Sequence, residues 1–125
     1  MRTVQQERAS FALKKVKEIA IENREEFRKL AESFPAMIRM NGLGQAAAFY
    51  YGKGGVHRQL CDLLSDWLQQ PGQLYHGKNL IDGITQGDMH QYRHAQTEAL
   101  LLLDWVKKFA RAFAEEENAR EEENA

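Results

Sequence analysis

The sequence predicts an all-α fold, a compact bundle of about four to five helices with long first and last helices. Apolar residues recur three and four positions apart through most of the chain, which is the pattern of amphipathic helices. Proline occurs only at Pro35 and Pro71, so few positions break a helix. With 125 residues, 43% of them hydrophobic, the chain has the size and composition of one domain, which we place at residues 1–114.

The first helix is predicted as one segment of roughly thirty residues that ends near Phe34. Asn23 is the one polar residue in its rhythm of apolar and small side chains. Pro35 favours the first turn of a second helix over residues 35–50, because a proline there gives up no helical hydrogen bond. The face of the first helix that should pack against another helix, which we call its seam, comprises Ala9, Leu13, Val16, Ala20, Phe27, Leu30 and Phe34.

The run Gly52-Lys53-Gly54-Gly55 interrupts the chain before a third amphipathic helix at residues 56–68. Glycines at 77, 83 and 87 leave room for only a short helix near Leu80. Asp88 and Gln91 form a capping box that starts the last helix. Its seam comprises Tyr92, Ala95, Ala99, Leu102, Val106, Phe109 and Phe113.

The chain ends in an acidic tail, residues 115–125, where six glutamates outnumber the single Arg120. The tail offers no apolar face, and we expect it to fray or to be disordered. Residues 1–114 carry an excess of Lys and Arg over Asp and Glu, which permits binding to nucleic acid without demonstrating it.

We expect a cytoplasmic protein without membrane contact. No apolar stretch follows Met1 and none approaches the length of a membrane span. The lone Cys61 has no disulfide partner and lies in an apolar helical pattern, where a free cysteine usually packs as a small hydrophobe.

The sequence contains no recognisable catalytic constellation, and we predict neither an enzyme nor a cofactor. His90 and His94 have the spacing that can place two imidazoles on one metal ion. Residue 91 is Gln rather than the Glu of a zinc protease, so exposed surface histidines are the favoured interpretation and no metal site is predicted. The glycine run at 52–55 lacks the spacing of a phosphate loop.

Four basic residues have no acidic residue three or four positions away on the same predicted helix: Lys17, Arg24, Arg39 and Arg93. On the first helix, Lys14, Lys17, Arg24 and Arg28 form a stripe beside the seam. Such a stripe can follow a nucleic-acid backbone, and it is equally compatible with an ordinary soluble helix surface.

Several segments resemble a known family. Residues 34–45, continuing to Tyr50 and Lys53, are similar to the small helical subunit of the type III-B CRISPR effector, the Cmr complex. The last helix resembles that family's closing segment, from Tyr92-Arg93 through residues 97–100 to Trp105 and residues 107–110. Residues 6–9 and 67–68 agree as well, so the resemblance spans about residues 3–113 without the region 69–87.

The resemblance implies a non-catalytic subunit of an RNA-guided ribonucleoprotein of antiviral defence. Such a subunit stacks with its own copies beside the backbone subunits and contacts the CRISPR RNA and the target RNA. A helical adaptor that binds only proteins is the alternative.

The resemblance also implies particular site residues. Gly42 and Gly44 would permit the close approach of another backbone. Trp105 fits the bundle core or a subunit interface better than a base-stacking role. Asn41 is as well suited to a structural role as to RNA contact. The implied RNA-binding residues are Arg39, Lys53 and Arg93, and the residues for partner or RNA contact are Asn41, Gln45 and Lys108. Lys17 and Arg24, which lack an acidic partner on the predicted helix, are expected to help the three RNA-binding cations.

Overall fold

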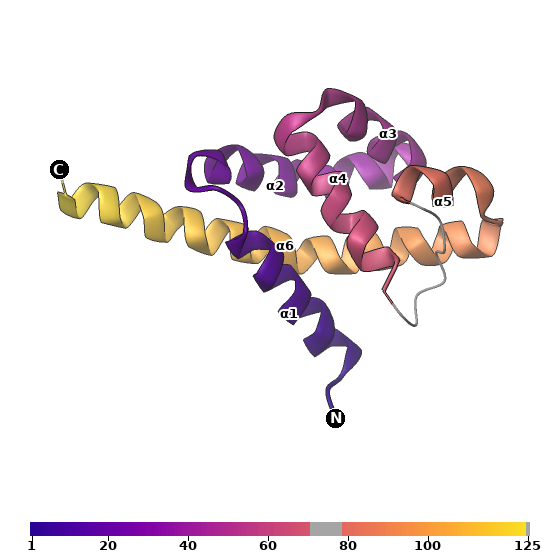
Figure 1. Ribbon diagram of the computed structural model, residues 1–125, viewed down its shortest axis with the longest axis horizontal. Coiled ribbons are helices and arrows are strands. Elements are labelled where there is room, and N and C mark those ends of the chain that lie inside the picture. The colour runs from indigo at the N-terminus through magenta and orange to yellow at the C-terminus, as the bar shows by residue number, and fades with distance from the viewer. Residues whose placement is uncertain (71–78, 125) are drawn as a thin grey trace.

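The computed structural model describes residues 1–70 and 79–124, and in these ranges every regular element is helical, which confirms the all-α class (Figure 1). The longest helix, α6, crosses the whole view, with α2 to α5 on one side of it and α1 crossing it (Figure 1). The elements are α1 (Val4–Lys17), the 3-10 turn η1 (Ile21–Asn23), α2 (Arg24–Asn41), α3 (Leu43–Lys53), α4 (Gly55–Leu68), α5 (Leu80–Gln86) and α6 (Met89–Asn124).

The predicted first helix is wrong in its length, because the chain forms two helices where one was expected. The first of them, α1, starts at a capping box in which the Thr3 hydroxyl accepts from the Gln6 backbone N–H at 3.1 Å. It ends at Lys17, and α2 begins at Arg24 after a 3-10 turn that contains Asn23. One straight helix of roughly thirty residues would span about 45 Å, and one of its ends would extend away from α6. The turn lets both helices pack on α6.

Pro35 also differs from the prediction, since it lies buried inside α2 rather than at a helix start. The break comes later, at Gly42, whose φ of +85° is a conformation that residues with a side chain rarely adopt. Gly42 both ends α2 and precedes α3. Backbone geometry at this glycine, rather than the proline, therefore sets the boundary.

The core forms where α1 and α2 pack against α6, as the two predicted seams require. Val16, Phe27 and Phe34 are at most 2% exposed, and they face a helix whose own seam residues Ala99 and Leu102 are fully buried. The predicted pairing of the first and last segments is thus confirmed, although two helices supply the first seam and Ala20, predicted as part of it, is exposed between them.

A second group of helices lies beside α2: α3 and α4 pack on α2, and α5 packs on α3 and α4. The rings of Phe34 and Tyr50 lie 4.2 Å apart between α2 and α3. The Leu80 backbone N–H donates to the hydroxyl of Ser65 at 2.9 Å, which ties α5 to α4. The predicted helix at 56–68 and the short helix at Leu80 are confirmed.

The start of α6 is confirmed and its end is not as predicted. Asp88 and Gln91 exchange backbone and side-chain hydrogen bonds of 2.8 and 2.9 Å, the predicted capping box. Instead of becoming disordered at residue 115, α6 continues to Asn124 and projects beyond the bundle (Figure 1). Extending an existing helix needs no new nucleation, and Glu, Ala and Arg are strong helix formers. An ion pair of 2.9 Å between Arg120 and Glu116 adds support.

Candidate nucleic-acid interface

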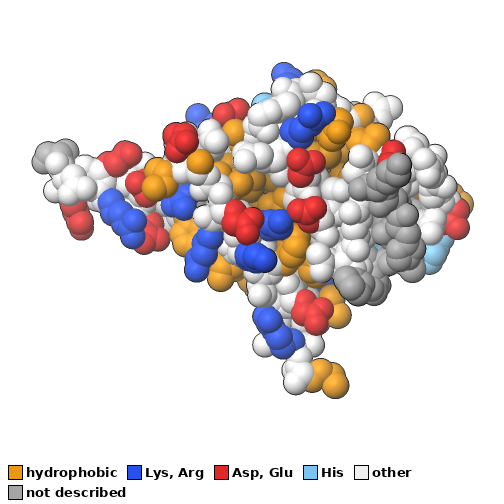
Figure 2. Space-filling model, in the orientation of Figure 1, with side chains coloured by type: hydrophobic (Ala, Val, Ile, Leu, Met, Phe, Trp, Pro, Cys, Tyr) orange, Lys and Arg blue, Asp and Glu red, His pale blue; other side chains and the backbone are white. Residues whose placement is uncertain are grey.

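The five cations proposed for RNA have no acidic partner within 4.0 Å in the described part of the chain. The same holds for Arg2, Lys14, Lys29 and Arg58, so the absence of a partner does not by itself mark a site. On the face seen in Figure 2, Lys and Arg side chains alternate with Asp and Glu rather than forming one basic patch. The position of each cation in the fold therefore matters more than the total charge.

The junction of α2 and α3 is held by side chains from α6. The Tyr92 hydroxyl accepts from the Gly44 backbone N–H at 2.8 Å, and the Gln96 amide oxygen accepts from Leu43 N–H at 2.9 Å. These bonds satisfy donors at the start of α3 that no helical carbonyl can reach. They also bring the two segments that most resemble the family to one end of the bundle.

Four polar residues surround this junction, and we refer to them as the corner surface: Arg39, Asn41, Gln45 and Arg93. All four are exposed. Arg39 and Asn41 belong to the last turn of α2, Gln45 to the first turn of α3, and Arg93 directly follows Tyr92. Two guanidinium groups and two amide groups at one end of the bundle offer several donors to phosphate or ribose oxygens.

The glycines of the junction have an internal packing role. A Cβ atom on Gly44 would lie 3.0 Å from Cγ2 of Ile84 and 3.4 Å from the Tyr92 hydroxyl. A Cβ atom on Gly42 would lie 3.0 Å from the same hydroxyl. The close approach expected from the sequence is therefore made by side chains of α5 and α6 within this chain.

Lys53 lies at the other end of α3, away from the corner surface. Its ammonium nitrogen is 5.0 Å from the centre of the Phe49 ring, a cation–π contact. It borders an open depression of about 700 Å³ whose wall includes Asn23, Glu26 and His57. Because α3 has 11 residues, about 15 Å of helix separates Lys53 from the start of α3.

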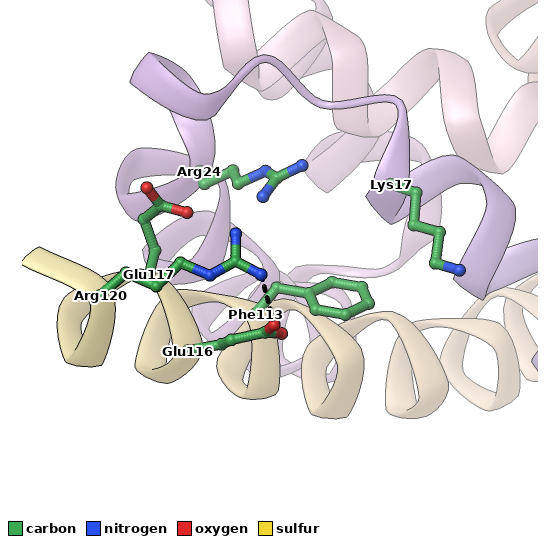
Figure 3. Close-up of a pocket in the computed structure, with 6 residues that line it drawn as sticks. All are labelled: Lys17, Arg24, Phe113, Glu116, Glu117 and Arg120. Carbon is green, nitrogen blue, oxygen red and sulfur yellow. Dashed lines mark hydrogen bonds and ion pairs between the residues drawn. The ribbon is translucent and has the colours of Figure 1, made fainter.

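Lys17 and Arg24 form a third location, at the turn between α1 and α2. Their side chains line a pocket of about 200 Å³ with Phe113, Glu116, Glu117 and Arg120 of α6 (Figure 3). Nε of Arg24 donates to the Ile19 carbonyl oxygen at 3.2 Å. The predicted RNA-binding cations thus occupy three separate places along the bundle.

Lys108 is engaged within its own helix. Its ammonium nitrogen lies 3.0 Å from an Asp104 carboxylate oxygen and 5.9 Å from the centre of the Trp105 ring. Trp105 is half-buried, and its ring stacks on that of Phe109 at 5.8 Å. Lys108 is therefore less available to a partner than the residues of the corner surface.

Sequence reasoning missed a buried polar cluster formed by Arg8, Trp67 and Glu98. Arg8 donates to the two carboxylate oxygens of Glu98 at 2.8 and 2.7 Å, and the Trp67 indole N–H donates at 3.0 Å. Glu98 is 5% exposed. The hydrogen bonds from Arg8 hold the pKa of Glu98 below its ordinary value, against the opposing effect of burial.

A signal for this cluster was present in the sequence. Glu98 falls three residues after Ala95 and four before Leu102, which places a carboxylate on the buried seam of the last helix. A buried carboxylate requires a cationic or hydrogen-bonding partner. Arg8, Trp67 and Glu98 lie in three of the short segments that resemble the family, residues 6–9, 67–68 and 97–100.

The residues weighed for chemistry are placed as follows. Cys61 is buried, its thiol donates to the Ala47 carbonyl oxygen at 3.8 Å, and burial raises its pKa to about 12. His90 is exposed and His94 is half-buried. In residues 1–70 and 79–124, no group of three or more His, Cys, Asp or Glu side chains could hold a metal ion. No described helix is long and apolar enough to cross a membrane.

Comparison with known proteins places this helical arrangement in a family. The family of CRISPR-associated Cmr5 proteins matches residues 4–113. The chain belongs to the Cmr5 family. A curated Thermus thermophilus relative, the "CRISPR system Cmr subunit Cmr5", is 34% identical over 118 residues, which cover 93% of this chain and 100% of that protein. A crystal structure of a Cmr5 family protein from Thermus thermophilus superimposes with a TM-score of 0.76 at 33% identity, over 89% of this chain and 97% of that one.

The Cmr5 match includes the corner surface, Lys53 and the buried Arg8–Glu98 cluster, and it ends at Phe113. The acidic part of α6 follows directly after this point. The pocket at Lys17 and Arg24 therefore combines residues inside the match with Glu116, Glu117 and Arg120 outside it.

Proposed function

We propose that this Cmr5-family chain is a non-catalytic small subunit of the type III-B CRISPR ribonucleoprotein, the Cmr complex. In that assembly it stacks with its own copies, contacts the backbone subunits and binds the CRISPR RNA and target RNA. The support for the assembly is family membership, together with the naming of the Thermus thermophilus relative as a Cmr subunit.

The observation that carries RNA contact is the corner surface. Arg39 and Arg93 are exposed, lack an acidic partner within 4.0 Å in the described residues, and flank a junction fixed by Tyr92. Rigid support lowers the entropy lost when arginines engage a phosphate. Lys53, Lys17 and Arg24 extend the same contact along the bundle, and Asn41 and Gln45 supply hydrogen bonds without charge. Contacts of this kind follow the backbone and show little sequence preference.

The test replaces the three main cations by alanine, as R39A/K53A/R93A, inside the assembled complex. Removing one phosphate contact should lower the slope of log affinity against log salt by about 0.7 to 0.9, with affinity falling similarly across RNA sequences. The matched control is R2A/K29A/R58A, which removes the same charge from exposed residues that have no ion pair in the described chain and lie outside the basic stripe. The control should keep wild-type affinity and slope.

Two results would overturn this assignment. An assembled R39A/K53A/R93A complex with wild-type affinity and salt slope would remove these residues from the RNA interface and favour the protein-only adaptor. Failure of assembly by a variant whose melting temperature is unchanged would move the corner surface to the subunit interface, starting with Arg39 and Asn41.

A further inference from the structure

We propose that the acidic extension of α6 is an internal competitor that limits RNA access to Lys17 and Arg24. This inference rests on the proposed RNA contact and adds its regulation. The extension begins just after the end of the Cmr5 family match at Phe113, and it continues the packed helix α6.

The geometry is shown in the close-up of the pocket (Figure 3). Lys17 ends α1 and Arg24 begins α2, and in this view Arg24 and the two carboxylates lie on one side of the Phe113 ring and Lys17 on the other. Glu116 and Glu117 lie one helical turn farther along α6 and line the same pocket. A phosphate that reached both cations would enter a pocket with two carboxylates in its wall.

The charges in this pocket nearly balance. Lys17, Arg24 and Arg120 face Glu116 and Glu117. Arg120 is engaged by Glu116 at 2.9 Å, whereas Lys17 and Arg24 have no ion pair within 4.0 Å in the described chain. Neither cation is paired with a carboxylate, although Nε of Arg24 donates to the Ile19 carbonyl oxygen, and the two carboxylates in the pocket wall repel a phosphate that approaches.

The covalent link makes this competition persistent. The carboxylates belong to the same helix as the packed residues Val106 and Ala110, so they remain beside the basic pair at a fixed effective concentration. Neutralising Glu116 has a second effect, since it also releases Arg120 into the pocket. The extension therefore weakens RNA contact by repulsion, while its own cation Arg120 is held by Glu116.

The experiment neutralises the two pocket carboxylates as E116Q/E117Q and measures binding of fluorescent single-stranded RNA to the full-length chain. Affinity should rise roughly three- to tenfold at low salt, and the gain should fade as salt screens the carboxylates. The matched control is E122Q/E123Q, which changes the net charge equally at exposed positions outside the pocket. In a K17A/R24A background, the gain from E116Q/E117Q should fall to the level of the control.

The outcomes separate this inference from the proposed function. Equal gains in the two glutamine pairs, no gain in either, or a gain that survives K17A/R24A would overturn the competition. An E116Q/E117Q gain that depends on Lys17 and Arg24 supports it, even if R39A/K53A/R93A leaves RNA binding in the complex unchanged. Loss of RNA binding in R39A/K53A/R93A without any effect of E116Q/E117Q leaves the proposed function standing and rejects the competition.

Discussion

Glu98 shows how one buried carboxylate connects three distant parts of this fold. Its two oxygens accept from Arg8 on α1 and from Trp67 on α4, while Glu98 itself lies on α6. A buried ion pair does not guarantee a net gain in stability, because both charges lose solvation. Removing one partner is different, since the remaining charge then stays buried and unpaired.

We expect E98Q to lower the free energy of unfolding by about 2 to 4 kcal/mol at neutral pH, because an amide cannot neutralise the Arg8 guanidinium. The control is E7Q, at an exposed residue of α1. The folded-state pKa of Glu98 lies below its ordinary value of 4.5, so its contribution is complete above that pH and is lost as pH falls through the folded-state value. Urea titrations at about pH 7 and about pH 3 should show the gap between wild type and E98Q narrowing in acid. A gap of constant size would contradict this role for Glu98.

Among the helices, α6 supplies the surface on which both α1 and α2 pack. This arrangement explains why the apolar pattern of the last helix is broader than one stripe. Leu102 and Leu103 are fully buried, and Leu100 and Trp105 are half-buried against the core cluster. Leu101 is 43% exposed and faces away.

Replacing Phe27 or Leu102 with alanine should lower the free energy of unfolding by about 2 to 5 kcal/mol, since both side chains are buried between α6 and its neighbours. The matched control is L101A, the same residue type one position earlier, where exposure should keep the loss below about 1 kcal/mol. Chemical denaturation followed by circular dichroism measures all three. Similar stabilities for L101A and L102A would contradict the packing of α6.

For the molecule as a whole, the acidic extension adds to the helix content but contributes little to the stability. Residues 115–124 are helical, yet all except the half-buried Glu117 are exposed, so they bury little surface. The core continues no farther along α6 than Ala114, which is 5% exposed.

Deleting residues 115–125 should therefore remove helical signal in proportion to its length and change the free energy of unfolding by no more than about 1 kcal/mol. Far-ultraviolet circular dichroism at low temperature measures the first quantity and thermal unfolding the second. A large drop in melting temperature would mean that the extension docks on the bundle.

The local features of this protein were readable from residue order. The helical class, the seams around Phe27 and Leu102 and the capping box at Asp88 depend on side chains three or four positions apart, and such neighbours meet in any helix. The resemblance to the family rested on the same short segments. Arg39 and Arg93 could be named in this way, and the structure adds that they lie around one junction.

The remaining features depend on contacts between residues far apart in the chain. The turn after Lys17 interrupts a continuous apolar rhythm so that α1 and α2 can both reach α6. The junction at Gly42 needs the Tyr92 hydroxyl, and the Arg8–Glu98 pair joins residues 90 positions apart. The extension was expected to be disordered, and only its continuation from a packed helix places Glu116 and Glu117 beside Arg24. Periodicity records which face of a helix is apolar, whereas the partner of that face is fixed by packing in three dimensions.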